Sequence, residues 1–112
     1  MKFFETRFGG GKGLEEVRLE PEQIPLWAKA FDVESLDGLF DLATAEQAIP
    51  LFDAAINRFN HDPDSLRPLL DASDFRGLRG NRMVLQQMRA TLADFADATI
   101  SGLVEHDVPT PP

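Results

Sequence analysis

The sequence predicts a mainly α fold with a minor β component: an N-terminal β-hairpin followed by a four- to five-helix bundle with a long C-terminal helix. Three observations predict it. Residues 2–8 and 14–20 alternate in side-chain character on either side of a glycine run, which is typical of paired strands. Three segments begin with proline and leucine, a typical helix start. The last long segment repeats apolar side chains at three- and four-residue steps.

The length predicts a single domain over residues 1–108, because 112 residues are enough for one hydrophobic core. Residues 1–20 form the hairpin in this prediction, 21–106 are helical, and 109–112 form a disordered tail. The expected core consists of the large apolar side chains on the predicted inner faces: Phe8, Val17, Leu19, Trp27, Phe31, Leu36, Phe40, Phe52, Ile56, Phe59, Leu69, Leu85, Met88, Leu92 and Phe95.

Composition predicts a cytoplasmic protein that neither spans nor coats a membrane. No apolar run approaches the ~18 residues that a membrane span needs. Lys2 and Glu5 place charge where a signal peptide would need apolar residues, and the chain has no cysteine. The net charge of −8 disfavours nonspecific binding to nucleic acid or to anionic lipid.

The glycine run from Gly9 to Gly13 is interpreted as the tip of the hairpin. It resembles a phosphate-binding loop only superficially, because that loop needs Ser or Thr after its lysine and then a helix. Here Gly13 follows Lys12, and a strand pattern comes next. A lone two-stranded ribbon is marginally stable, so the hairpin must pack on the helices or gain strands from another chain.

The first helices are predicted from their caps and apolar stripes. Residues 21–31 form one helix, and Ser35 caps a short second one that runs to Ala43. Thr44 and Gln47 form a capping-box pattern that opens the next helical segment. Pro50 lies inside that segment, where it either kinks one helix or separates two.

The last helix is predicted from an Asn81 cap to about His106. Leu85, Met88 and Leu92 begin its apolar stripe, which continues to Leu103. A helix of this length spans roughly 35 Å, which is long for so small a domain. Two interpretations remain open: the shorter helices pack around it, or part of its stripe meets the same helix of a second copy in a homodimer.

Neither catalysis nor metal binding has a recognisable motif. His61 and His106 have no second ligand at suitable spacing, and Pro63 interrupts the acidic turn after His61. The chain lacks cysteine, tyrosine and a nucleophile elbow. We therefore expect no enzyme, no catalytic residue, no metal site and no cofactor.

An arginine cluster forms a candidate anion-binding site. Arg76, Arg79 and Arg82 are spaced by three residues on or just before the start of the last helix, where the helix dipole disfavours cations. An anion should offset them. Asp71, Asp74 or the acidic segment 32–41 are internal candidates, and an external phosphate or acidic partner is the alternative. Direct nucleic-acid binding is not expected from an acidic chain in which Phe75 is the only aromatic near these arginines.

The acidic residues suggest a surface that binds a basic protein. The candidate acidic face comprises Glu16, Glu20, Glu22, Asp32, Glu34, Asp37 and Asp41. Such a face steers and masks a basic partner, as small inhibitory or immunity-type proteins do. The leading hypothesis is therefore a non-enzymatic protein-binding module. A homo-oligomeric structural or assembly factor is the alternative, and a phosphate or nucleic-acid binder acting through the arginine cluster is the second alternative.

Overall fold

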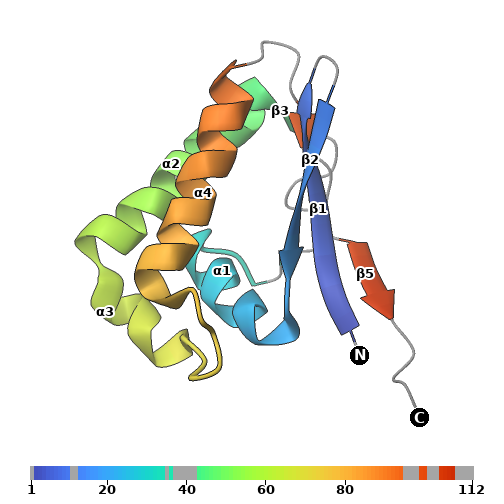
Figure 1. The fold of residues 1–112 in the computed structure, drawn as a ribbon. Helices are drawn as coiled ribbons and strands as arrows, with labels where there is room; N and C mark the ends of the chain where they lie inside the picture. The colour runs from blue at the N-terminus through green and yellow to red at the C-terminus, as the bar shows by residue number, and fades with distance from the viewer. Residues whose placement is uncertain are drawn as a thin grey trace.

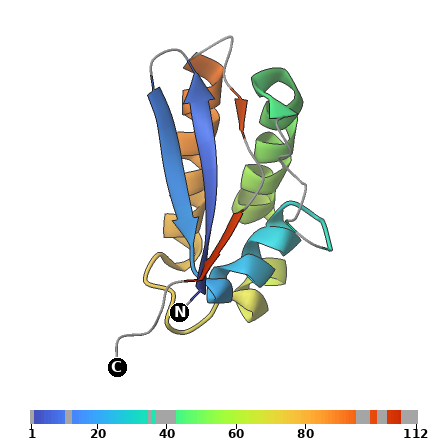
Figure 2. The same cartoon turned by 90° about the vertical axis from the view of Figure 1, so that its right-hand side faces the viewer.

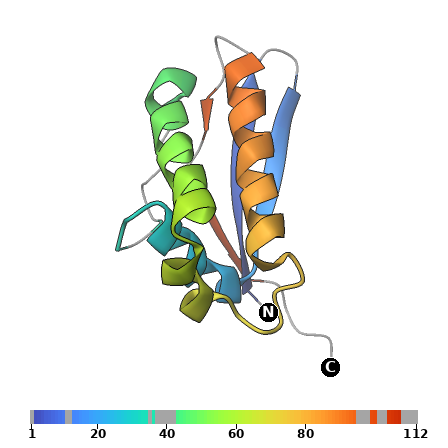
Figure 3. The same cartoon turned by 90° about the vertical axis from the view of Figure 1, so that its left-hand side faces the viewer.

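The computed structural model describes residues 2–10, 13–34, 36, 43–94, 99–100 and 104–107, and these form two layers: helices on one face of an antiparallel sheet (Figures 1 and 2). The strands are β1 (Lys2–Gly10), β2 (Gly13–Leu19), β3 (Ala43–Thr44), β4 (Thr99–Ile100) and β5 (Val104–Asp107). The helices are α1 (Ile24–Ala30), α2 (Ala45–His61), α3 (Pro63–Leu66) and α4 (Gly77–Asp94), with short 3₁₀ helices η1 (Pro21–Gln23) and η2 (Arg67–Leu69). Figure 3 shows α2 and α4 side by side in the helical layer.

The sheet is centred on β1, in the order β2-β1-β4-β3. β2 pairs antiparallel with one edge of β1, in a register that places Phe4 opposite Leu19. β4 and β5 pair with the other edge, where Ile100 lies opposite Phe8 and Val104 lies opposite Glu5. The turn between β1 and β2 falls on residues 11–12, outside the described residues, so the complete hairpin stays a prediction.

The prediction that the last helix reaches His106 is wrong. α4 ends at Asp94, and the chain then contributes β4 and β5 to the sheet. Two physical reasons explain the difference. Without these strands, one edge of β1 would carry unpaired backbone groups over most of its length. Thr99, Ile100 and Val104 are also β-branched, a residue type that favours strands over helices.

The prediction that α4 begins at an Asn81 cap is also wrong. The helix begins at Gly77, one turn earlier, and Asn81 is a fully buried residue inside it. Gly77 has φ of 63°, a left-handed conformation that glycine adopts without strain. The Asp74 carboxylate accepts a hydrogen bond from the Arg76 backbone N–H at 3.0 Å, just before the helix.

The described residues between Pro21 and Asp94 are mainly helical, as predicted. The Thr44 hydroxyl accepts from the Gln47 N–H at 3.3 Å, and the Gln47 side chain accepts from the Thr44 N–H at 3.1 Å, which confirms the capping box. α2 continues through Pro50, so the open question there resolves to a single helix. The short helix expected after Ser35 falls mostly on residues outside the described ranges, and Ala43 lies in β3.

The core lies between the helices and the sheet. The predicted core side chains found buried are Leu19, Trp27, Phe31, Leu36, Phe52, Phe59, Leu85, Met88 and Leu92, whereas Ile56 and Leu69 are partly buried against them. The ring centroids of Phe31 and Phe52 lie 5.4 Å apart in an edge-to-face arrangement. The side chains of Phe8, Val17, Phe40 and Phe95 lie outside the described part. None of the described helices is both long and apolar enough to cross a bilayer.

Candidate functional site

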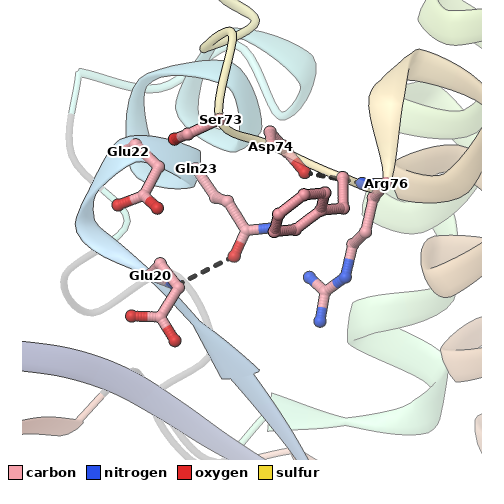
Figure 4. A pocket seen from close by; sticks show the side chains of 7 residues that line it. Glu20, Glu22, Gln23, Ser73, Asp74 and Arg76 are labelled. Carbon is pink, nitrogen blue, oxygen red and sulfur yellow. Dashed lines mark hydrogen bonds between the residues drawn. The ribbon is translucent and has the colours of Figure 1, made fainter.

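A pocket of about 350 Å³ lies where the end of β2 and η1 meets the loop that leads into α4 (Figure 4). We call it the acidic pocket. Its lining residues are Glu20, Glu22, Gln23, Ser73, Asp74, Phe75 and Arg76. Three carboxylates against one guanidinium give this lining a net negative charge. The two glutamates come from one wall, and Arg76 stands across the pocket from them in Figure 4.

The glutamate wall is fixed by a capping box. The Gln23 side chain is buried, and its Oε1 accepts a hydrogen bond from the Glu20 N–H at 2.8 Å. The Glu20 side chain in turn accepts from the backbone of Gln23. These reciprocal bonds close the first turn after β2 and hold the backbone that carries both glutamates. Since Pro21 fixes its own φ at the start of that turn, the wall is locally rigid.

The opposite wall is anchored to the core through Asn81. Its Oδ1 accepts a hydrogen bond from Trp27 Nε1 at 2.8 Å. Its Nδ2 donates to Asp74 Oδ2 at 3.0 Å and to the Gly77 carbonyl at 2.7 Å. One buried amide therefore joins α1, the loop and the start of α4. Phe75 and Arg76 follow directly after the tethered Asp74, so this network positions them.

Phe75 is the largest exposed apolar side chain beside the pocket. Its relative exposure is 104%, so it contributes no buried surface to the described fold. An isolated exposed apolar residue is common on protein surfaces and needs no special explanation. Here, however, the ring adjoins a pocket lined with carboxylates. An aromatic face beside carboxylates is a suitable environment for an ammonium or guanidinium group.

The loop before Phe75 also carries Asp71, whose carboxylate is ionised at neutral pH. Asp71 accepts hydrogen bonds from the Ser73 hydroxyl at 2.6 Å and from the Ser73 backbone N–H at 2.8 Å. These bonds stabilise the carboxylate, and they hold the pKa of Asp71 below its ordinary value. Asp71 is exposed and adds negative charge next to the pocket.

The structure brings together part of the predicted acidic face. Glu20 and Glu22 share the acidic pocket. Asp32 and Glu34 are exposed beyond the other end of α1, a seven-residue helix that spans about 10 Å. The remaining predicted members cannot be placed on this surface, because Asp37, Asp41 and the side chain of Glu16 lie outside the described part.

The predicted arginine cluster is divided between two places. Arg76 lines the acidic pocket, whereas Arg79 and Arg82 line a second pocket on the side of α2 and α3. The division follows from the start of α4: Arg76 precedes the left-handed Gly77, whereas the other two arginines belong to the helix. Arg67, which the sequence did not join to this cluster, lines the second pocket with them.

Sequence reasoning missed the role of three residues. In the sequence, Phe75 stands out only as an aromatic near the arginines, Asn81 has the properties of a helix cap, and Gln23 carries no signal beyond its place after Glu22. The Glu20-to-Gln23 spacing is a capping-box pattern in which glutamate replaces the usual Ser or Thr, and it could have revealed the rigid wall. The contact between residues 20–23 and 73–76 has no local signal.

Comparisons with known proteins give no functional information, so the functional proposal rests on the geometry of the pockets. No family model, curated protein or solved structure matches the chain. Among the described side chains, no group of three or more histidines and carboxylates is placed to hold a metal ion. What the acidic pocket can bind therefore follows from its charge, its aromatic ring and its shape.

Proposed function

We propose that this protein is a non-enzymatic protein-binding module, of the inhibitory or immunity type, that masks a basic surface of its partner. The acidic pocket forms the centre of the binding surface, and Asp32 and Glu34 extend it. The observation that carries the proposal is the fully exposed Phe75 ring beside Glu20 and Glu22. Folding gains nothing from an aromatic side chain in water, whereas a partner that covers it gains its full apolar area.

The expected contact is a lysine or arginine of the partner that enters the pocket. Its charge meets the glutamates, and its aliphatic stem or guanidinium plane packs on the Phe75 ring. The fixed backbone of the glutamate wall limits the entropy lost on binding. The net charge of −8 adds long-range attraction, which raises the association rate for a basic partner.

A capture experiment from the native cell tests the proposal. The immobilised wild-type protein, the Glu20→Gln/Glu22→Gln variant and a Glu46→Gln/Asp94→Asn control are compared by mass spectrometry. The control removes the same charge from exposed positions at the start of α2 and the end of α4, at the opposite end of the helical layer (Figure 1). We expect a basic protein with wild type and control, and its loss with the pocket variant. Equal recovery of the basic protein by all three proteins would show that the acidic pocket does not bind it.

The alternative of a homo-oligomeric assembly factor stays a prediction, and sedimentation separates it from the proposal. A monomer at all working concentrations would eliminate the assembly factor. A stable dimer whose formation buries Phe75, detected as dissociation in Phe75→Ala, would instead show that the pocket receives a second copy of this chain.

A further inference from the structure

A second pocket, of about 410 Å³, lies where the end of α2 and the α3–η2 segment face the first turns of α4. We call it the arginine pocket. Its lining residues are Phe59, Asn60, Pro63, Arg67, Leu78, Arg79 and Arg82. Three of these seven are arginines, and the lining contains no carboxylate. The pocket is thus opposite in charge to the acidic pocket.

The arginines of this pocket are incompletely neutralised within the described chain. Arg67 pairs with Asp64 on the exposed surface. Arg82 donates from Nη1 to the neutral amide oxygen of Asn60 at 3.0 Å. For the exposed Arg79 side chain, no hydrogen-bond or ion-pair partner occurs among the described residues. Among the described residues, a single carboxylate, that of Asp64, thus pairs with any of the three guanidinium groups of this pocket.

Arg82 also carries an unmet hydrogen-bond donor. Its Nε is buried and has no hydrogen-bond partner in the described part of the molecule. A buried donor without an acceptor is costly, and the cost rises when the group is charged. The positive end of the α4 dipole lies within the same two turns and adds to the local positive potential. A bound anion would accept a hydrogen bond from the Arg82 guanidinium, and its negative charge would offset the positive potential at the start of α4.

The chemistry of the lining favours phosphate. Planar guanidinium forks bind phosphate oxygens in bidentate pairs, and two or three of them can converge on one dianion. The apolar walls from Phe59, Pro63 and Leu78 offer a surface for an organic group attached to it. A nucleic acid fits less well, because an extended polyanion would also meet the acidic surface of a molecule with net charge −8.

We propose that the arginine pocket binds a phosphate group, held by Arg79 and Arg82 with Arg67 at its rim. Phosphate from two sources could occupy it: the free ion or a monoester. The free ion would use the guanidinium groups alone, whereas a monoester would also contact the apolar walls. This site shares no lining residue with the acidic pocket, so the test of phosphate binding is independent of the test of the proposed function.

A titration followed by amide NMR tests the site on the whole protein. Inorganic phosphate and phenyl phosphate are added separately, with potassium chloride at matched ionic strength as the reference. We expect saturable shifts for Asn60, Arg79 and Arg82 with the phosphates and none with chloride. Tighter binding of phenyl phosphate would identify a monoester, and equal binding would identify the free ion.

Matched variants decide whether the arginines carry the binding. Arg79→Gln and Arg82→Gln should each weaken the affinity about tenfold, whereas Arg89→Gln should leave it unchanged. Arg89 lies on the same helix but pairs with Asp53 at 2.8 Å, away from the pocket lining. Absence of saturable shifts in the wild-type protein, or equal weakening by all three variants, would overturn the proposal. Tighter binding of a single-stranded oligonucleotide than of either phosphate would also overturn it, in favour of a nucleic-acid site.

Discussion

The acidic and arginine pockets both adjoin the start of α4, yet the fold treats their charges differently. In the acidic pocket, one of the three carboxylates also stabilises the fold: Asp74 accepts hydrogen bonds from the Arg76 backbone N–H and from the buried Asn81 amide. In the arginine pocket, the one acceptor of Arg82 among the described residues is the neutral amide of Asn60, and Arg79 has no described partner. Carboxylates therefore share the pocket of Arg76, whereas none lines the pocket of Arg79 and Arg82.

The side chains around the two pockets are of two kinds: those that stabilise the fold through hydrogen bonds, and those that are available to bind a ligand. Asp74, Asn81 and Gln23 are tied into hydrogen bonds that support the backbone. Glu22, Phe75 and Arg79 are placed by that support, and no described interaction that holds the fold depends on their side chains. Substitutions of the first kind should lower stability, and substitutions of the second kind should lower binding only.

The largest effect is expected for Asn81→Ala, which removes the buried amide that joins α1, the loop before α4 and the first turn of α4. Trp27 Nε1 would lose its acceptor and Asp74 would lose a donor, at buried or partly buried positions. We expect a loss of about 3 kcal/mol in the free energy of unfolding. Urea unfolding followed by the fluorescence of the single tryptophan measures it. The exposed Asn57→Ala serves as the control, and similar losses for both would contradict the role given to Asn81.

Phe75→Ala should change binding without changing the fold. The ring is fully exposed, so the free energy of unfolding should stay within about 0.5 kcal/mol of wild type. Affinity for the basic partner should fall about tenfold, because the partner loses the aromatic surface. Calorimetry with the purified partner, with urea unfolding in parallel, checks both parts. Full affinity in Phe75→Ala would show that the ring lies outside the interface.

The sequence predicted the helical core well because local pattern suffices for it. Leu85, Met88 and Leu92 repeat at helical spacing, and all three are buried. The ends of α4 were predicted wrongly because they depend on distant partners. Asn81 has the properties of a cap, but its amide bonds to Trp27, 54 residues away. The segment after Asp94 continues an apolar stripe, but it pairs with β1 at the other end of the chain.

The sequence predicted the charged residues of the candidate site but not which of them lie close together in the fold. The acidity around Glu20 and Glu22 is visible in the sequence. Their proximity to Phe75 results from packing between segments more than 50 residues apart, for which a single sequence carries no signal. The arginines were grouped by their three-residue spacing on or just before the start of the last helix, which was predicted at an Asn81 cap. The helix begins instead at Gly77, so Arg79 and Arg82 belong to it and Arg76 lies outside it.

A smaller effect is expected for Asn60→Ala in the arginine pocket. It removes the acceptor that holds Arg82 Nη1, so the guanidinium becomes less ordered. We expect about threefold weaker phosphate binding, as for the loss of one exposed hydrogen bond. Binding of the basic partner should not change. The same NMR titration measures the first effect, and a loss of partner affinity would contradict the separation of the two pockets.

The smallest effect is expected for Ser73→Ala beside the acidic pocket. Loss of the hydroxyl donor should raise the pKa of Asp71 toward its ordinary value of 3.8, while the backbone N–H keeps part of the shift. Because the pKa of Asp71 is lower in the folded state, its contribution to stability is present above pH 3.8 and is lost as pH falls through the lowered pKa. NMR titration of the carboxyl carbon measures this change. An unchanged pKa would contradict the assigned cause.

The central claim is that the charge of the acidic pocket meets a basic surface of the partner. The salt dependence of the affinity for the captured, purified partner tests it most directly, with wild type, Glu20→Gln/Glu22→Gln and Glu46→Gln/Asp94→Asn compared in parallel. The affinity of wild type and control should fall steeply with added salt, whereas the pocket variant should bind more weakly and respond less to salt. The same affinity and the same salt dependence for all three proteins would contradict the account.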